Sequence, residues 1–325
     1  MAILVTGGAG YIGSQMVLDL VDADETVLVL DDLSTGFEAA VSPKSRLVVG
    51  DVGEASLVSR LIVEHNIDAI IHFAGSIVVP ESVANPLYYY LNNASKTRTL
   101  IEVAVACRVP HFIFSSTAAV YSAQGSLPVK EGDPLLPQSP YGRSKLISEW
   151  ILQDVSRVQP IKFAILRYFN VAGADPQRGI GQSTRGASHL IKAAIETATG
   201  KRPFVEVFGT DYPTPDGTCV RDYVHVKDLA GAHRLALARL RDGGESIIVN
   251  CGYGRGYSVL EVLHAVEKIS GIKLDIRMAA RRPGDAAMII ADPSVATTQL
   301  SWTPTFDSLD AIIRSALEWE LARSY

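Results

Sequence analysis

The sequence predicts an α/β fold: a doubly wound parallel sheet with a second, smaller, discontinuous α/β domain. Strand-like and helix-like patterns alternate regularly over the first half of the 325 residues. Such alternation indicates a parallel sheet that helices cover on both faces. The strand-like segments are short continuous runs of Val, Ile and Leu, which is typical of strands buried on both sides.

The elements of the large sheet can be placed one after another along the chain. Four segments have helical patterns, at 11–23, 56–66, 100–108 and 139–157. The apolar runs predict strands at 2–7, 26–32, 46–51, 69–75, 111–117 and 162–170. Ligands of such sheets bind beyond the carboxyl ends of the strands, so the functional residues are expected there.

The rhythm changes after residue 173. The segment 174–221 is rich in Gly, Pro, Thr and Asp and contains one clear helix, at 189–200. A helix at 225–240 and a strand at 246–252 resume the first pattern and are expected to return to the large sheet. From Ser258 on we expect two helices and few strands. We therefore predict a dinucleotide-binding domain over 1–173 plus 222–251, and a substrate domain over 174–221 plus 252–325.

The composition excludes several classes of protein. A formal net charge of −5 argues against a nucleic-acid-binding surface. The longest apolar runs are too short to span a membrane. The three cysteines are few and widely spaced, which favours a reducing, cytoplasmic location without disulfides. The histidines and cysteines show no zinc spacing, so no metal site is predicted.

A glycine-rich turn joins the first strand to the first helix. In TGGAGYIG, Gly7 allows a tight turn, Gly10 lets a pyrophosphate approach the backbone, and Gly13 permits close helix–strand packing. The spacing is G-x-x-G-x-x-G, and a plain tight turn could carry the same glycines. Asp31 ends the next strand, about 20 residues on, where an acid can bind ribose hydroxyls. Since no arginine follows nearby to accept a 2′-phosphate, the pair of signals favours NAD over NADP.

Two further strand ends carry polar residues. Asp51 ends the third strand and could accept a hydrogen bond from the adenine amino group, or cap the next helix instead. His72 lies within an apolar strand, and we interpret it as a satisfied core histidine rather than a catalytic base.

The chemistry is expected where the fifth strand meets the helix before the sixth. Tyr141 and Lys145 are four residues apart, so they share one helix face. A lysine one turn away and a positive nicotinamide ring would both stabilise the phenolate of Tyr141. Thr117, at the end of the fifth strand, could share a hydrogen bond with Tyr141 and a substrate hydroxyl. The group would act as a general base on an alcohol as hydride leaves its carbon.

With these residues, the chain resembles the extended short-chain dehydrogenase/reductase family, whose members have a Rossmann-type domain. Within it, the chain is similar to the branch that epimerises UDP-sugars. The motifs VTGGAGYIGS, HFAG, IFSSTAAVYS, SPYGRSK, LRYFNVAGA, GTCVRDYVHVKDLA and RRPGD carry the resemblance over nearly the whole chain. The resemblance implies an NAD-dependent isomerase that interconverts UDP-galactose and UDP-glucose. The sugar is oxidised at C4 to a 4-keto intermediate, rotates and takes the hydride back. The resemblance also implies a homodimer.

The resemblance assigns roles at matched positions. Catalysis falls to Tyr141 as the base, Lys145 as its electrostatic partner and Thr117 as the hydroxyl bridge. The positions matched to NAD binding are Gly7, Gly10, Tyr11, Ile12, Gly13, Asp31, Asp32, Ser34, Thr35, Asp51, Val52, Phe73, Ala74, Gly75, Asn92, Ser115, Tyr141, Lys145 and Tyr168. The positions matched to the UDP-sugar are Thr117, Tyr141, Asn170, His189, Leu190, Phe208, Arg221, Ile289, Arg282 and Asp285.

Three positions depart from the pattern of many relatives. Ile77 replaces a lysine that contacts the cofactor ribose, His189 replaces an asparagine near the diphosphate, and Ile289 borders the sugar at a variable position. These changes keep open a C4 epimerase of another UDP-sugar, such as an N-acetylhexosamine, pentose or uronate.

Two other functions fit the residues less well than epimerisation does. Dehydratases and decarboxylases of the family carry an extra acid near the threonine, whereas Ala118 and Ala119 follow Thr117 here. A non-catalytic dinucleotide sensor would typically have lost Tyr141 or Lys145, and both are present.

Overall fold

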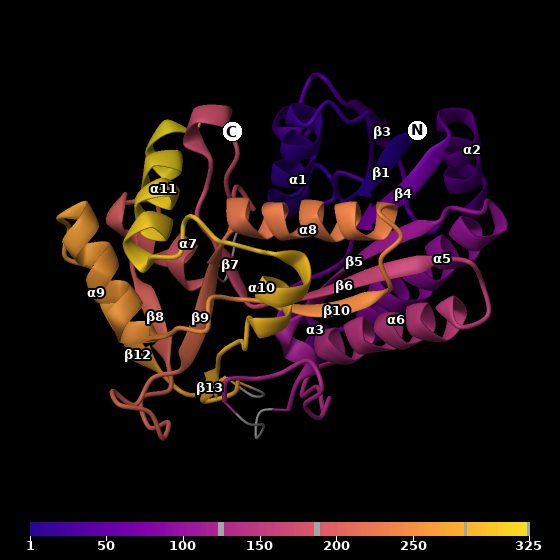
Figure 1. The fold of residues 1–325 in the computed structure, drawn as a ribbon. Helices are drawn as coiled ribbons and strands as arrows, with labels where there is room; N and C mark the ends of the chain where they lie inside the picture. Colours follow the sequence, from indigo (N-terminus) through magenta and orange to yellow (C-terminus); the bar gives the residue numbers. More distant parts are fainter. Residues whose placement is uncertain (123–126, 185–188, 283–284, 324–325) are drawn as a thin grey trace.

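A seven-stranded parallel sheet forms the larger part of the molecule in a computed structural model that describes residues 1–122, 127–184, 189–282 and 285–323. The strand order is β3-β2-β1-β4-β5-β6-β10, so the chain winds outward from β1 in both directions (Figure 1). The strands are β1 (Ala2–Thr6), β2 (Val27–Asp31), β3 (Arg46–Val49), β4 (Ile67–His72), β5 (His111–Thr117), β6 (Lys162–Tyr168) and β10 (Ile247–Cys251). This confirms the doubly wound fold, including the return of the late strand, which pairs with β6.

Helices cover both faces of this sheet and complete its two core clusters. One face packs against α1 (Tyr11–Asp22), α8 (Val226–Arg241) and α10 (Ser294–Leu300). The other face packs against α2 (Ala55–His65), α5 (Lys96–Ala106) and α6 (Pro140–Ser156). The alternate side chains of each buried strand therefore enter two different apolar layers.

Three short helical pieces between β4 and α5 were not predicted. They are α3 (Val79–Ala84), α4 (Pro86–Tyr89) and the π-helical turn η2 (Tyr90–Ser95). They pack on α6, beside the cavity described below. Single turns of 3₁₀ helix lie at η1 (Glu38–Ala40), η3 (Ala118–Val120) and η4 (Pro176–Arg178).

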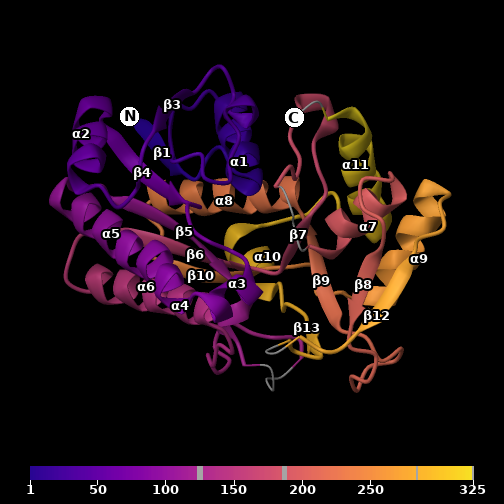
Figure 2. The same cartoon turned by 180° about the vertical axis from the view of Figure 1, so that it is seen from behind.

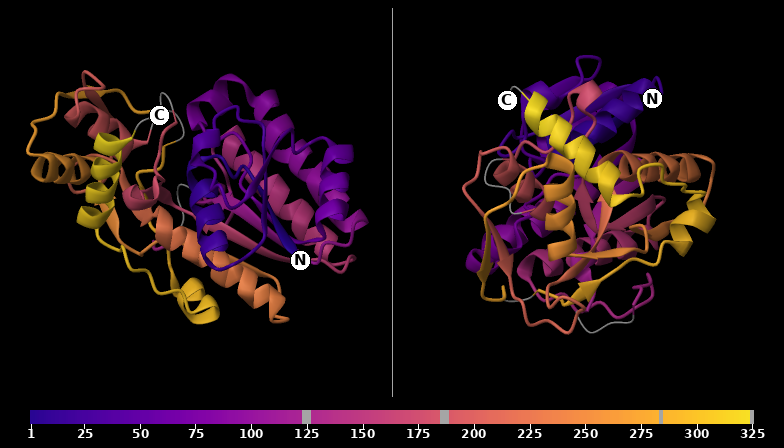
Figure 3. Two further views of the ribbon diagram at one scale, coloured as in Figure 1. Left: turned by 90° about the horizontal axis from the view of Figure 1, so that it is seen from above. Right: turned by 90° about the vertical axis from the view of Figure 1, so that its left-hand side faces the viewer.

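The smaller lobe is built around short strands (Figures 1 and 2). Strand β9 (Val220–His225) pairs with β7 (Asn170–Ala172), β11 (Gly256–Ser258) and β13 (Met288–Ile289), and β8 (Val205–Phe208) pairs with β12 (Ile276–Ala279). A third core cluster joins these strands to α7 (Leu190–Ala198), α9 (Val259–Ser270) and α11 (Leu309–Ala322). Seen from above, the two lobes lie side by side (Figure 3).

The C-terminal segment is shared between the lobes. We expected two helices after Ser258, and the described residues contain three. The additional helix, α10, packs on α8 and β10, and its Ala296 and Leu300 belong to a core cluster of the large sheet. The division into 1–173 plus 222–251 and 174–221 plus 252–325 stays a prediction, and the packing of α10 suggests assigning that helix to the first domain.

Candidate active site

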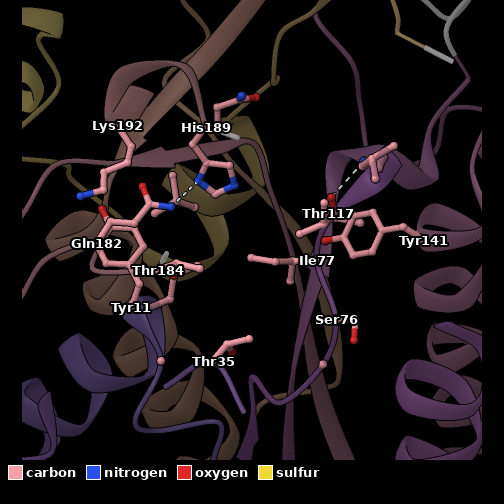
Figure 4. Close-up of a pocket in the computed structure, with 18 of the residues that line it drawn as sticks. Tyr11, Thr35, Ser76, Ile77, Thr117, Tyr141, Gln182, Thr184, His189 and Lys192 are labelled. Atoms are coloured by element: carbon pink, nitrogen blue, oxygen red, sulfur yellow. Dashed lines mark hydrogen bonds between the residues drawn. The ribbon is translucent and has the colours of Figure 1, made fainter. Parts of the chain in front are cut away.

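A cavity of about 830 Å³ lies between the lobes, at the carboxyl ends of the parallel strands. Every residue that the sequence matched to NAD or UDP-sugar binding lines it. Figure 4 shows Thr117 and Tyr141 side by side on one side of the cavity and His189 with Gln182 on the other. The location agrees with the rule that ligands of open parallel sheets bind beyond the strand ends.

The glycine-rich turn has no room for a side chain at Gly7 or Gly13. Gly7 has a φ of +72°, and a Cβ atom there would lie 2.5 Å from the backbone nitrogen of Ala74. A Cβ atom on Gly13 would lie 2.1 Å from the carbonyl oxygen of Gly7. Gly10 precedes α1 without a side-chain cap, so the positive end of the helix faces the cavity through backbone alone. These features suit a pyrophosphate.

The carboxylates at the strand ends hold their loops as well as lining the cavity. Asp31 accepts hydrogen bonds from the backbone N–H groups of Ala9, at 2.8 Å, and Leu33, at 2.9 Å. Asp51 accepts one from Gly53 at 2.7 Å and pairs with Lys96 at 2.7 Å. The N-cap of α2 is Glu54, so Asp51 is not that cap. Each carboxylate retains lone pairs for a ligand hydroxyl or amine.

The middle of the cavity is lined by residues from the loop after β4, from η2, and from the ends of β5 and β6. Asn92 donates from Nδ2 to Oγ of Ser76 at 2.9 Å, which ties η2 to the loop after β4. The hydroxyl groups of Ser115 and Tyr168 hydrogen-bond to each other across the strand ends. The hydroxyl of Tyr11 donates to the carbonyl oxygen of Gly173 at 2.5 Å and so joins α1 to the smaller lobe.

The residues around position 140 explain why α6 begins where it does. Pro140 occupies the first helical position, and Ser139 caps the helix by accepting from the N–H of Gly142 at 3.2 Å. Tyr141 and Lys145 then project from one buried face, and Nζ of Lys145 donates to the carbonyl oxygen of Ser115 at 3.0 Å. The predicted base and its cation are therefore both fixed against the end of β5.

Burial sets the proton affinities of this pair. It raises the pKa of the Tyr141 phenol, and a hydrogen bond with Thr117 opposes that rise. It lowers the pKa of Lys145 to about 8, against the influence of Glu149. Since desolvation disfavours the charged form of each group, a phenolate at Tyr141 needs nearby positive charge.

The substrate positions gather on the smaller lobe. The guanidinium of Arg282 lies over the ring of Phe208, 3.6 Å from its centroid, and Nη2 of Arg221 lies 3.8 Å from Oδ1 of Asp285. Nδ1 of His189 lies 2.8 Å from Nε2 of Gln182. Asn170, Leu190 and Ile289 line the same wall. Residues 283 and 284 of the RRPGD motif lie outside the described residues.

His72 is a satisfied core histidine, as predicted. Its Nδ1 lies 2.6 Å from Oγ1 of Thr6, and its Nε2 lies 2.8 Å from Oγ1 of Thr97. Burial lowers its pKa to about 3, so the ring is neutral and both of its nitrogens have hydrogen-bond partners.

The side chain of Ile77 is half exposed and lies at the cavity wall.

Sequence reasoning missed several lining residues. Tyr223 follows Arg221 by two positions on β9, so the period of a strand could have placed both on one face. Gln182 and Thr184 come from an irregular segment, and no sequence signal indicated them.

Comparisons with known proteins agree with this geometry. Residues 3–252 match the NAD dependent epimerase/dehydratase family. A UDP-glucose 4-epimerase of Azospirillum brasilense is 51% identical over 318 residues, which cover 98% of this chain and 91% of that protein.

Two solved structures are similar over almost the whole chain. The Bifidobacterium longum UDP-glucose 4-epimerase in complex with NAD⁺ and UDP has a TM-score of 0.94 at 38% identity, covering 99% of this chain and 98% of the other. The UDP-Glc/GlcNAc 4-epimerase of Campylobacter jejuni has a TM-score of 0.85 at 45% identity, covering 98% and 99%. The chain belongs to the NAD dependent epimerase/dehydratase family.

Proposed function

We propose that this protein interconverts UDP-galactose and UDP-glucose with NAD as its cofactor, by oxidation and reduction at C4 of the sugar. The observation that carries the proposal is one continuous cavity with a Tyr–Lys–Thr group on the sheet edge and two arginines on the opposite lobe. The relatives reported above are epimerases of the same kind over the same length.

The residues present fit a dinucleotide. The glycines at positions 7, 10 and 13 let a pyrophosphate approach the backbone of the turn, and Asp31 at the end of β2 can accept hydrogen bonds from ribose hydroxyls. When bound, NAD would accept a hydride from C4 and return it. Further positions proposed to hold it are Tyr11, Ile12, Asp32, Ser34, Thr35, Asp51, Val52, Phe73, Ala74, Gly75, Asn92, Ser115 and Tyr168.

Tyr141 is the proposed general base and acid. Its phenolate takes the proton of the sugar 4-hydroxyl, directly or through Thr117, as the C4–H bond breaks and the C=O bond forms. On the return step the phenol gives the proton back to the 4-oxygen. The ammonium of Lys145 supports the phenolate electrostatically, in surroundings where burial alone would keep the phenol protonated.

The smaller lobe is proposed to hold the UDP while the sugar turns. Arg221 and Arg282 offer planar guanidinium groups to the diphosphate, and Asp285 can accept hydroxyl groups of the ribose. A grip on UDP alone leaves the 4-keto sugar free to present its opposite face to the hydride. Asn170, His189, Leu190, Phe208 and Ile289 are proposed to complete this wall.

A C4 epimerase of N-acetylated UDP-sugars is the second candidate. Ile289 is only partly buried where it borders the cavity, and it is neither a bulky aromatic residue nor a small one. A wall of this intermediate size does not exclude an N-acetyl group.

The test incubates purified protein, without added cofactor, with UDP-galactose, UDP-N-acetylgalactosamine or UDP-xylose. Sugar analysis resolves the products, and NAD released by denaturation is quantified. Conversion of UDP-galactose to UDP-glucose with endogenous NAD is expected. No conversion of any of the three, even with added NAD, would overturn the proposal.

We further propose a homodimer that uses the exposed apolar residues beside α6. Leu87 is 79% exposed, Leu91 55% and Trp150 52%, and their elements α4, η2 and α6 pack together. The neighbouring apolar stripe at 100–106 on α5 belongs to a core cluster instead. Trp150→Glu should lower the mass measured by light scattering to that of one chain. Val158→Glu, at a residue just beyond α6 that is also exposed, should not.

We propose a reducing compartment, the cytoplasm, as the location. Cys107, Cys219 and Cys251 are all free. Among the described residues, the structure has no helix with the length and apolar character needed to cross a membrane. Fractionation of cells that express the chain would test the location.

A further inference from the structure

The helix face that carries the base extends to a third charged residue. Glu149 follows Lys145 by four positions, as Lys145 follows Tyr141, so the three share one side of α6. Glu149 is fully buried, and so is its partner Arg167 on β6. The proposed mechanism assigns roles to Tyr141 and Lys145, but it assigns none to the buried pair of Glu149 and Arg167.

Three consecutive residues at the end of β5 meet this face. The carbonyl oxygen of Ser115 accepts from Nζ of Lys145 at 3.0 Å. The hydroxyl of Ser116 donates to Oε1 of Glu149. Thr117 follows and hydrogen-bonds to Tyr141. Ser116, which holds Glu149, therefore lies between the residue that contacts Lys145 and the residue that contacts Tyr141.

Arg167 lies opposite Ser116 in the ladder of β5 and β6. Its Nε donates to Oε1 of Glu149 at 3.0 Å, and its Nη2 donates to Oε2 at 2.6 Å. Its Nη1 donates to the hydroxyl of Tyr121 and to the carbonyl oxygen of Glu131, both at 3.0 Å. The guanidinium therefore joins α6 to β6 and to the loops beyond β5.

A buried ion pair is not by itself a stabilising choice. Removing two charges from water costs free energy that their attraction often only balances, so apolar residues could fill this space as well. Stability therefore does not explain why charged residues occupy this place, whereas a role in fixing the geometry and charge of neighbouring groups would explain it. The alternative, a purely structural pair, predicts no effect on the ionisation of its neighbours.

We propose that Glu149, paired with Arg167, is a positioning residue that acts through Lys145: it fixes α6 against the end of β5 and keeps the ammonium group charged. This inference rests on the proposed function for its consequence in catalysis. Its electrostatic part can be measured without turnover.

The groups around Lys145 support this assignment. His72 faces it from β4 and is neutral, because burial lowers the pKa of the imidazole to about 3. Tyr168 comes from β6, and burial raises the pKa of its phenol. The π-helical turn contributes the uncharged Asn93, which donates to Oγ of Ser144. Burial lowers the pKa of Lys145, and the negative charge of Glu149 opposes that fall.

The experiment measures the pKa of Lys145 directly in the protein as purified. The Cε chemical shift of isotopically labelled lysine is followed against pH, with the resonance assigned through Lys145→Met. The variants are Glu149→Gln, Arg167→Gln and the double variant. Asp68→Asn is the matched control, since Asp68 pairs with two nitrogens of Arg241, at 3.0 and 3.1 Å, near the start of β4. The same proteins give pH profiles of kcat with UDP-galactose.

The two single variants should shift the pKa of Lys145 in opposite directions. Glu149→Gln removes a negative charge and leaves Arg167 unpaired, so the pKa should fall by about one unit or more. Arg167→Gln leaves the carboxylate unpaired, so the pKa should rise. The basic limb of the kcat profile should move in the same directions, because activity needs the ammonium. Asp68→Asn should change neither.

Shifts in one common direction, or none, would overturn the inference and leave the pair structural. Melting curves identify a variant that fails to fold, and Glu149→Asp, which keeps the charge, should then retain the pKa of the parent protein. If the parent protein turns over no UDP-sugar, the proposed function fails while the lysine titration still decides the electrostatic part.

Discussion

The two walls of the cavity differ in how completely they are built. On the sheet wall, Thr117, Tyr141 and Lys145 are each less than a tenth exposed, and every one is held by neighbouring strand or helix residues. On the opposite wall, His189 and Asp285 are exposed and come from segments far apart in sequence. The first wall is fixed before a ligand arrives, whereas the second offers charged side chains for a ligand to engage.

This contrast suggests a division of labour. Preorganised groups in a water-poor site favour the chemical step, and exposed charged groups favour binding. Substitutions on the sheet wall should therefore lower kcat, and those on the smaller lobe should mainly raise KM. Variants on each wall therefore test that division.

Tyr141→Phe should reduce kcat by about 10²- to 10⁴-fold, since it removes the group that exchanges the proton. KM and the amount of NAD released by denaturation should change little, because the ring and its packing remain. Steady-state kinetics with UDP-galactose and NAD quantification provide the measurement. Tyr90→Phe, in the neighbouring π-helical turn and outside the cavity lining, is the control that should stay active. If Tyr141→Phe retained more than a tenth of the activity, Tyr141 would not be the general base.

Arg282→Ala should raise KM for UDP-galactose by about 10- to 100-fold and leave kcat within a few-fold, as expected when a hydrogen bond to a charged group is lost. Arg281→Ala is the adjacent control. Arg281 pairs with Asp211 at 2.6 Å and lies over Tyr212, and it is not among the cavity-lining residues. A drop in kcat at unchanged KM for Arg282→Ala would contradict the division between the walls.

The two lobes also differ in how much of their structure the sequence could predict. The strands of the large sheet are apolar runs of four to seven residues, and their ends fall at Asp31 and Thr117 as expected. Strands β7, β11 and β13 have two or three residues, too few to show a period. Their pairing on β9 joins 170–172, 256–258 and 288–289, and no local pattern encodes such distant partners.

Chemical roles were easier to predict than packing partners. The spacing of Tyr141 and Lys145 placed both on one buried helix face, as the structure has them. The partner of α10 could not be predicted, because an amphipathic helix does not specify which apolar surface it covers. The particular backbone partners of Asp31 could not be predicted either, since they depend on the exact course of the loop at Leu33.

The smallest expected effect is on the choice of sugar. Ile289 lies beside Arg221 in the pairing of β13 with β9 and borders the cavity. Ile289→Ala should raise kcat/KM for UDP-N-acetylgalactosamine relative to UDP-galactose by about tenfold, because even one methylene group in an apolar pocket is worth about 1–3 kcal/mol of discrimination. Both substrates are assayed by product analysis on one enzyme preparation.

Ile290→Ala separates this effect from a general loosening of β13. The side chain of Ile290 packs on Gly256, where an added Cβ would lie 2.5 Å from its Cδ1, and it is not among the cavity-lining residues. Both variants lose packing, so both can lower the folded fraction. The ratio of the two kcat/KM values is independent of that fraction, because each substrate is turned over by the same active molecules. A rise in the ratio for Ile289→Ala alone places sugar selection at this wall, and an equal change in both variants would refute it.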